Sequence, residues 1–167
     1  MAAFCNVDMG VGEYAKAMTF STLIKELSEL LNVEIEDAGG AFALEIDGQT
    51  VILQLADGLS DDILLTRADL GEVPKDRLAA LSATALSANY LYLGTGGSTL
   101  AASPNGHLHL HRYDWLNRLD AESTTEMLTC FANAAAEWKR IVSDISTMPE
   151  TEQSADLTSS GQGFLQV

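Results

Sequence analysis

The chain has 167 residues, of which 47% are apolar and 20% are charged, and this is enough for one domain with its own hydrophobic core. The 9 basic and 24 acidic residues give a formal net charge of −15, and the basic residues form no cluster, which argues against binding to nucleic acid or to a membrane surface. We find neither a signal-peptide pattern nor an apolar run of membrane-spanning length. Cys5 and Cys130 match no metal or redox spacing, so we expect reduced thiols in a cytosolic protein.

The first expected element is a helix that ends near Leu31. Before it, residues 1–17 show no sustained period and contain Gly10 and Gly12, so we expect an irregular leader. Thr19 is a suitable N-cap for the helix. Apolar residues then recur at helical spacing: Phe20, Leu23, Ile24, Leu27, Leu30 and Leu31. From this point we expect one domain over residues 18–146.

Three strands are expected next. Alternation predicts strands over residues 41–46 and 50–55, joined by an Asp47-Gly48 turn, and a third strand over residues 62–70. Residues 33–37 are compatible with a further short strand. One face of the hairpin carries Phe42, Leu44, Ile46, Val51, Leu53 and Leu55.

The second face of these strands is not cleanly polar. We assign to it Ile52, Leu64, Ala68 and Leu70, where contact with water would favour polar residues. A helix, a second subunit or a bound segment is therefore expected to cover this face.

A second helix, a glycine-rich corner and a hairpin follow. Pro74 favours a helix start, and we expect the helix to run from about Lys75 to Leu91. The three glycines within residues 94–97 then end it. This corner lacks the lysine of a phosphate-binding loop and precedes a strand, which argues against a nucleotide site. Strands are expected over residues 98–102 and 107–113, joined by a turn at residues 104–106.

The last expected element is a helix with Asp120 or Ser123 as its N-cap. Ser123 and Glu126 have capping-box spacing, and an apolar face extends from Met127 to Ile145. The helix should end near Ser146, and the polar residues 147–167 have the composition of a disordered tail. The order α-β-β-β-α-β-β-α predicts an α+β fold in which three helices pack on a five-stranded sheet.

The strand over residues 107–113 carries a ladder of histidines on one face. His107, His109 and His111 alternate with Leu108 and Leu110, so neighbouring imidazoles lie about 7 Å apart, close enough for two of them to share a zinc ion. A catalytic metal needs further ligands, and the nearest carboxylate, Asp114, is at the strand end. We favour an ordinary sheet face, with a small metal-dependent enzyme as an alternative. If the histidines face solvent or a partner, protonation near pH 6 is expected to alter binding.

Several segments together resemble the class I type III secretion chaperones, the CesT or Tir-chaperone family. They are EIDGQTVILQL, ILLTRADLG, ALSANYLYLGTGGSTLAASPNGHLHLHR and AAAEWKRI, and the resemblance spans about Phe20 to Ile145. It implies an antiparallel, twisted five-stranded sheet and a homodimer in the bacterial cytosol. It also implies a protein without catalysis or cofactor that holds the N-terminal chaperone-binding segment of a secreted effector in a non-globular state, and so serves protein transport and virulence. The ATPase of the secretion apparatus is a further candidate partner.

The resemblance also implies two interaction surfaces. Residues of the effector groove, or of the core that supports it, would be Phe20, Leu23, Leu27, Phe42, Leu44, Ile46, Val51, Leu53 and Leu55. Residues of the dimer contact would be Leu81, Leu86, Tyr90 and Tyr92. For each of these residues, ordinary core packing remains open as the other interpretation. A second alternative function is a chaperone that acts as a regulator by sequestering a control protein.

Overall fold

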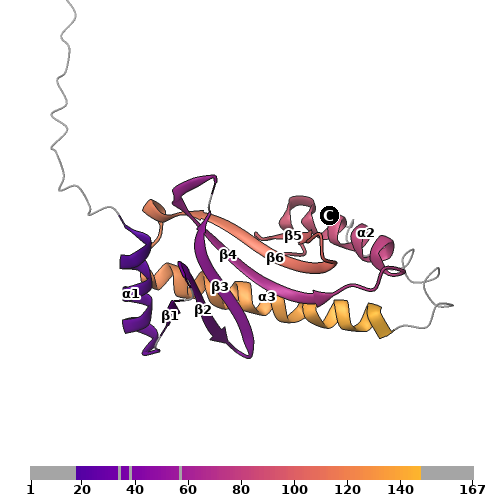
Figure 1. Ribbon diagram of the computed structural model, residues 1–167, viewed down its shortest axis with the longest axis horizontal. Helices are drawn as coiled ribbons and strands as arrows, with labels where there is room; N and C mark the ends of the chain where they lie inside the picture. The colour runs from indigo at the N-terminus through magenta and orange to yellow at the C-terminus, as the bar shows by residue number, and fades with distance from the viewer. Residues whose placement is uncertain (1–17, 34, 38, 57, 148–167) are drawn as a thin grey trace, which may run out of the picture.

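The computed structural model describes residues 18–33, 35–37, 39–56 and 58–147. The leader expected for residues 1–17 lies outside these ranges, as does the expected tail apart from residue 147. Figure 1 shows one curved antiparallel sheet with the long helix α3 running along it.

The α+β fold predicted from the sequence is confirmed, with small shifts of the element ends. The helices are α1 (Phe20–Leu31), α2 (Leu78–Asn89) and α3 (Ala121–Thr147), with the 3-10 turns η1 (Tyr90–Tyr92) and η2 (Leu116–Arg118). The strands are β1 (Glu36–Asp37), β2 (Ala41–Ile46), β3 (Gln49–Ala56), β4 (Ser60–Glu72), β5 (Thr99–Ala102) and β6 (His107–Trp115). The sheet order is β1-β2-β3-β4-β6-β5, so the five predicted strands are joined by the two-residue β1 at one edge.

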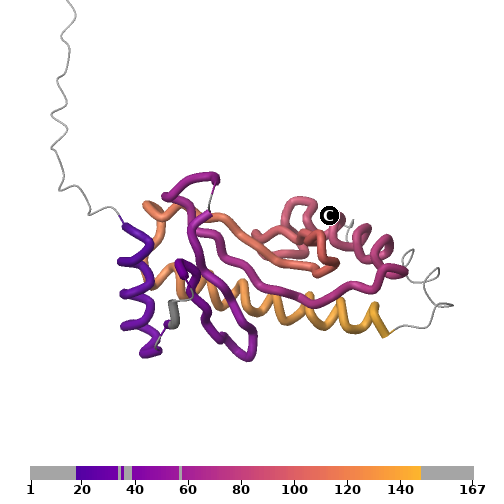
Figure 2. The backbone as a smooth tube through the Cα atoms, in the orientation of Figure 1, coloured from indigo at the N-terminus to yellow at the C-terminus, as the bar shows by residue number. Residues whose placement is uncertain are grey.

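Helix α1 begins as the sequence predicts. The Thr19 side-chain oxygen accepts a hydrogen bond from the backbone N–H of Thr22 at 3.2 Å. Leu23, Ile24 and Leu27 are buried, and the Phe20 ring meets the Phe42 ring edge-on at 5.4 Å. The helix therefore packs across one end of the sheet, whereas α2 lies at the opposite end (Figure 2).

One face of the sheet forms the core under α3. The register places Phe42 opposite Leu53 and Leu44 opposite Val51. The row that contains Leu53 continues to Thr66 of β4 and Arg112 of β6. Leu64, Ala68 and Leu70 lie on this same buried face, with 0%, 1% and 3% exposure. Our assignment of these three residues to the second face was therefore wrong. Alternation groups these three residues correctly, but their set belongs to the face that α3 covers and not to the second face, for which we expected a cover.

The second face of the sheet has no helix over it among the described elements. It carries Ile52 of β3 and alternate residues of β4 and β6, and none of its described residues is buried. Tyr113 and Trp115 lie on this face and are 50% and 47% exposed. In Figure 1, β2 and β3 pass in front of α3, so the open face of these two strands is turned towards the viewer.

Helix α2 ends earlier than expected, at Asn89, because the next residues change conformation. Leu91 and Tyr92 have positive φ angles of 53° and 57°, which cannot continue a right-handed helix. The corner then packs tightly: a Cβ on Gly94 would come within 2.8 Å of the Ala88 Cβ, and the Trp138 ring N–H donates to the Gly94 carbonyl at 2.9 Å. Glycine is thus required at residue 94 by this close approach.

Helix α3 is capped by Asp120, one of the two predicted candidates. Its carboxylate accepts a hydrogen bond from the Ser123 backbone N–H at 2.7 Å, and the Ser123 hydroxyl reaches back to the Asp120 backbone N–H at 3.3 Å. Seven α3 residues are buried, and they include Leu128, Phe131 and Trp138. The 27-residue helix ends at Thr147, one residue beyond the predicted end.

Candidate interaction surfaces

A groove lies where the end of α1 meets β2 and the first turns of α3. Its volume is about 630 Å³. The lining residues are Leu31, Val33, Ala43, Leu44, Glu45, Ile46, Asp47, Thr125, Leu128 and Thr129. We call this the edge groove, because it lies beside the part of β2 that β1 leaves uncovered.

The uncovered part of β2 is an open strand edge. β1 pairs only with Ala43 and Phe42, so Leu44, Glu45 and Ile46 have no described strand on that side. The Asp47-Gly48 turn makes Ile46 and Gln49 the closing pair of a two-residue hairpin. Backbone groups alternate along a strand, so the N–H and C=O of Glu45 point to the open edge. A free backbone next to an apolar groove can accept an additional strand.

A second, smaller groove lies on the other side of α1. It measures about 410 Å³ and is lined by Ser21, Ile24, Lys25, Ser28, Glu29, Ile35 and Phe42. The smaller groove follows α1 from Ser21 to Glu29, whereas the edge groove meets α1 only at its C-terminal end, at Leu31.

The predicted groove residues divide into core and surface. Leu23, Leu27, Leu44, Val51 and Leu53 are at most 5% exposed and form the core that supports the grooves. Phe20, Phe42, Ile46 and Leu55 are partly buried and pack against that core. Of the whole predicted set, Leu44 and Ile46 line the edge groove and Phe42 lines the smaller one.

A second candidate surface lies at the opposite end of the sheet, on α2 and η1. Leu86, Tyr90 and Tyr92 are 71%, 67% and 54% exposed, whereas Leu81 is 1% exposed and belongs to the core. Leu91 and Leu93, at 68% and 69%, extend the exposed set. We call Leu86 and residues 90–93 the α2–η1 surface. Exposed apolar residues in one contiguous stretch are typical of a protein contact.

The backbone of this surface is strained. Leu91 and Tyr92 hold left-handed conformations without the tolerance of glycine or asparagine. Such conformations cost about 1 to 3 kcal/mol each and are found most often at functional sites. The Asn89 side chain fixes the segment, since it donates to the Leu100 carbonyl and accepts from the Leu100 N–H.

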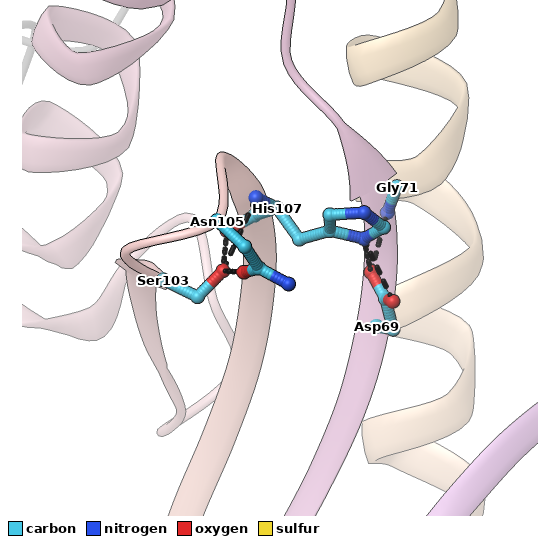
Figure 3. A network of polar contacts seen from close by, with 5 residues as sticks. All are labelled: Asp69, Gly71, Ser103, Asn105 and His107. Atoms are coloured by element: carbon cyan, nitrogen blue, oxygen red, sulfur yellow. Dashed lines mark hydrogen bonds and ion pairs between the residues drawn. The ribbon is translucent and has the colours of Figure 1, made fainter.

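The histidine ladder lies on the open sheet face, as its alternation predicts. The His107 ring nitrogen Nδ1 lies 2.9 Å from an Asp69 carboxylate oxygen, and Figure 3 shows this contact together with the bond from the Gly71 N–H to Asp69. The His107 and His109 rings stack at 6.3 Å, and the His111 ring meets Tyr113 edge-on at 5.5 Å.

Two groups have shifted pKa values: His111 of the ladder and Asp69, which is bonded to His107. Burial lowers the pKa of His111 below its ordinary value, and the nearby His109 lowers it further. Partial burial raises the pKa of Asp69, but the Gly71 N–H and His107 outweigh this effect, so the net pKa of Asp69 is lowered. Within the described ranges, no group of three or more His, Cys, Asp or Glu residues is arranged to hold a metal ion. The metal-enzyme alternative therefore gains no support.

Sequence reasoning did not identify the edge groove or the aromatic residues of the open face as exposed surfaces. Val33, Tyr113 and Trp115 are 42%, 50% and 47% exposed. The signal was present for Tyr113, which alternates with Leu110 and Leu108. Trp115 was not identified because the strand runs two residues beyond its expected end. Val33 was not identified because it follows the C-cap of α1, outside the helical pattern.

Comparison with solved structures identifies the fold class as that of type III secretion chaperones. The Yersinia pestis type III secretion chaperone SycH, solved with a fragment of YscM2, has a TM-score of 0.57 at 21% identity over 72% of this chain and 99% of that chain. The HopA1–SchA chaperone–effector complex gives a TM-score of 0.56 at 21% identity, over 72% of this chain and 93% of that chain. The ExoT–SpcS complex from Pseudomonas aeruginosa gives 0.53 at 21% identity, over 69% and 92% of the respective chains.

The family is identified by the match of the sequence to a protein-family model. The model of the Tir chaperone protein (CesT) family matches residues 22–139, so the chain belongs to this family, as the resemblance implied. No curated protein matches the chain. None of the helices in the described part of the chain has the length and apolarity to cross a lipid bilayer.

Proposed function

We propose that this protein is a type III secretion chaperone that binds the N-terminal chaperone-binding segment of a cognate effector and keeps it non-globular before secretion. The open β2 edge beside the edge groove is the observation that carries the proposal. An unfolded segment exposes apolar side chains and unpaired backbone groups, and this site offers partners for both. The similar HopA1–SchA structure is a complex of a chaperone with an effector, which supports the same conclusion.

The proposed effector site consists of the edge groove and the smaller groove. The cargo chain adds to β2 beside Glu45, and its alternate side chains enter the edge groove between Leu31, Val33 and Ile46. Phe42 lines the path on the other side of β1, and the Phe20 ring packs against it. The buried residues Leu23, Leu27, Leu44, Val51 and Leu53 hold these walls in place, and Leu55 completes the support.

We further propose that the protein acts as a homodimer through the α2–η1 surface. This surface exposes Leu86, Tyr90, Leu91, Tyr92 and Leu93 to solvent in the protomer. A protein with a net charge of −15 stays soluble with such a patch, but burial against a second copy removes the apolar area from water at about 25 cal/mol per Å². Leu81 is buried in the core and supports this contact by holding α2 against the sheet.

The proposed role requires no catalysis and no cofactor, and it places the protein in the bacterial cytosol, where effectors are held before export. The acidic surface favours cargo segments with basic residues, since Glu45 and Asp47 lie at the edge groove. The ATPase of the secretion apparatus is a further proposed partner.

Co-expression with effectors encoded next to the gene tests this function. We expect purification of a complex in which two copies of the chain hold one effector, with some tens of effector residues resistant to protease. An effector segment that remains protease-sensitive in the presence of excess chaperone would overturn the proposal. The matched pair Val33→Asp and Val33→Ala separates the site from the fold, because only the charged residue is expensive to cover with an apolar cargo side chain.

A further inference from the structure

The chain segment that precedes α1 is long enough to reach the edge groove. This leader, residues 1–17, joins the described part of the chain at Met18, just before α1 begins. The 12 residues of α1 span about 18 Å, whereas residues 11–17 span about 23 Å when extended. A leader that folds back along α1 therefore brings Val11 to the far end of the helix, where Leu31 lines the edge groove.

The folded-back leader would also arrive in the right direction. Helix α1 and strand β2 run in the same sense, because the Phe20 and Phe42 rings meet near the start of both elements. At their other ends, Leu31 and Ile46 both line the edge groove. A leader that returns along α1, past the smaller groove, therefore runs antiparallel to β2. Antiparallel pairing gives the slightly more stable strand ladder.

Part of the leader has the pattern of an added strand. Apolar residues alternate with a charged residue and a glycine in the order Val7, Asp8, Met9, Gly10 and Val11. In an extended chain the three apolar side chains share one face. The alternation is short, as is the open edge of β2 that it would cover. Beside that edge, the apolar face lies over the edge groove, and the backbone pairs with the outward N–H and C=O of Glu45.

We infer that residues 7–11 of the free protein add to the open β2 edge as an antiparallel strand and occupy the edge groove until an effector segment displaces them. This inference deepens the proposed function, on which the displacement step rests. The leader is the occupant because its length, direction and alternation all fit the site. A short tether gives an effective concentration of about 1 mM, so a local affinity of only about 0.1 mM keeps the site about 90% occupied.

Like charges keep this contact weak enough to be displaced. Glu45 alternates with Leu44 and Ile46, so its exposed carboxylate lies on the face of β2 that points away from the core. Asp8 alternates with Val7 in the same way and falls on the same side of the added strand. Like charges on neighbouring strands are destabilising. An effector segment with basic residues there meets an attraction instead and replaces the leader.

Amide hydrogen exchange of the full chain without effector tests the contact directly. The Glu45 N–H has no strand partner among the described residues, so its exchange reports whether the leader covers it. We expect this N–H to exchange about tenfold more slowly in the wild type than in Val7→Asp/Met9→Asp, which places two charges against the apolar groove. Asp8→Lys should slow the exchange further, because it replaces repulsion from Glu45 by attraction.

The matched control is Ala2→Asp/Ala3→Asp. It adds the same charge to the leader outside the alternating stretch and should leave the exchange of Glu45 at the wild-type rate. All of these substitutions lie before α1, so circular dichroism should show an unchanged fold in each variant.

Effector binding should change by the same factor as hydrogen exchange. A site that the leader fills about 90% of the time binds its effector about tenfold more weakly. Calorimetry with the N-terminal segment of the effector that co-purifies with the chain should therefore show about tenfold tighter binding to Val7→Asp/Met9→Asp than to the wild type, and unchanged binding to the control.

The outcomes separate this inference from the proposed function. Equal exchange of Glu45 in the wild type and in Val7→Asp/Met9→Asp would overturn the inference alone, and so would slow exchange combined with equal effector affinities. Slow exchange that the variant abolishes, in a protein that binds no effector segment, would support the leader contact and overturn the chaperone function.

Discussion

Asn89 and Leu100 join the end of α2 to the edge of the sheet through two hydrogen bonds. The Asn89 amide donates to the Leu100 carbonyl at 3.0 Å, and its oxygen accepts from the Leu100 N–H at 2.9 Å. The side chain thus acts as an additional strand partner at the outer edge of β5. It also positions the residues that follow it, which form the α2–η1 surface.

Asn89→Ala is expected to destabilise the protein by about 2 kcal/mol, because each lost hydrogen bond contributes about 1 kcal/mol and leaves an edge group unpaired. Denaturant unfolding followed by circular dichroism measures this change. Asn117→Ala, at an exposed residue of η2, is the control and should change the free energy of unfolding by less than about 0.5 kcal/mol. Equal effects of the two substitutions would contradict the structural role of Asn89.

Thr66 is an unfavourable residue in the core. It is fully buried at 0% exposure, and its hydroxyl has no hydrogen-bond partner among the described residues. Thr66→Val keeps the shape and removes the unpaired hydroxyl, so we expect a gain of about 1 kcal/mol in the free energy of unfolding. Thr66→Ser keeps the hydroxyl and loses a methyl group, and it should be destabilising. A stability loss in the valine variant would show that the hydroxyl has a partner.

Leu86 and Leu81 lie on the same helix but have opposite expected roles. Leu86 is 71% exposed and Leu81 is 1% exposed. Leu86→Asp should convert the dimer to a monomer in light scattering without loss of helical structure. Leu81→Ala should instead lower the free energy of unfolding by about 3 kcal/mol, because it leaves a cavity. An unchanged molar mass for Leu86→Asp would show that the dimer contact lies elsewhere.

Protein stability should depend on pH through His111. Burial and then His109 lower its pKa in the folded state from the ordinary value of 6.5, so the unfolded chain takes up the proton first. The contribution of neutral His111 is complete above pH 6.5 and is lost as the pH falls through the folded-state pKa. Chemical unfolding in the Leu86→Asp background, which separates stability from dimerisation, should show this loss, and His111→Gln should reduce it. An identical pH dependence in the two chains would contradict the account.

Local sequence patterns predicted most of the fold. Thr19, Asp120 and the Asp47-Gly48 turn act where their chemistry favours them, because caps and turns depend on neighbouring residues only. The face assignment of β4 failed because alternation groups residues into two sets without saying which set α3 covers. The early end of α2 comes with the left-handed conformations of Leu91 and Tyr92. The hydrogen bonds that hold this segment join Asn89 to Leu100, eleven residues apart, and no local pattern contains them.

The candidate site was predictable only in outline. Alternation identified Phe42, Leu44 and Ile46 as one face, but the edge groove also needs the end of α1 and the first turns of α3. The open edge arises because β1 is only two residues long and pairs with only two of the six residues of β2. Neither the length of a weak edge strand nor the meeting of three separate segments follows from residue spacing.

The most direct test is binding of an effector's N-terminal segment to the matched variants Glu45→Pro and Glu45→Ala. Proline removes the N–H that points to the open β2 edge and is tolerated on edge strands, whereas alanine keeps the N–H and removes the same side chain. We predict that Glu45→Pro weakens binding at least about tenfold by calorimetry, that Glu45→Ala weakens it much less, and that both proteins remain folded. Equal affinities of the two variants would contradict binding by strand addition at this edge.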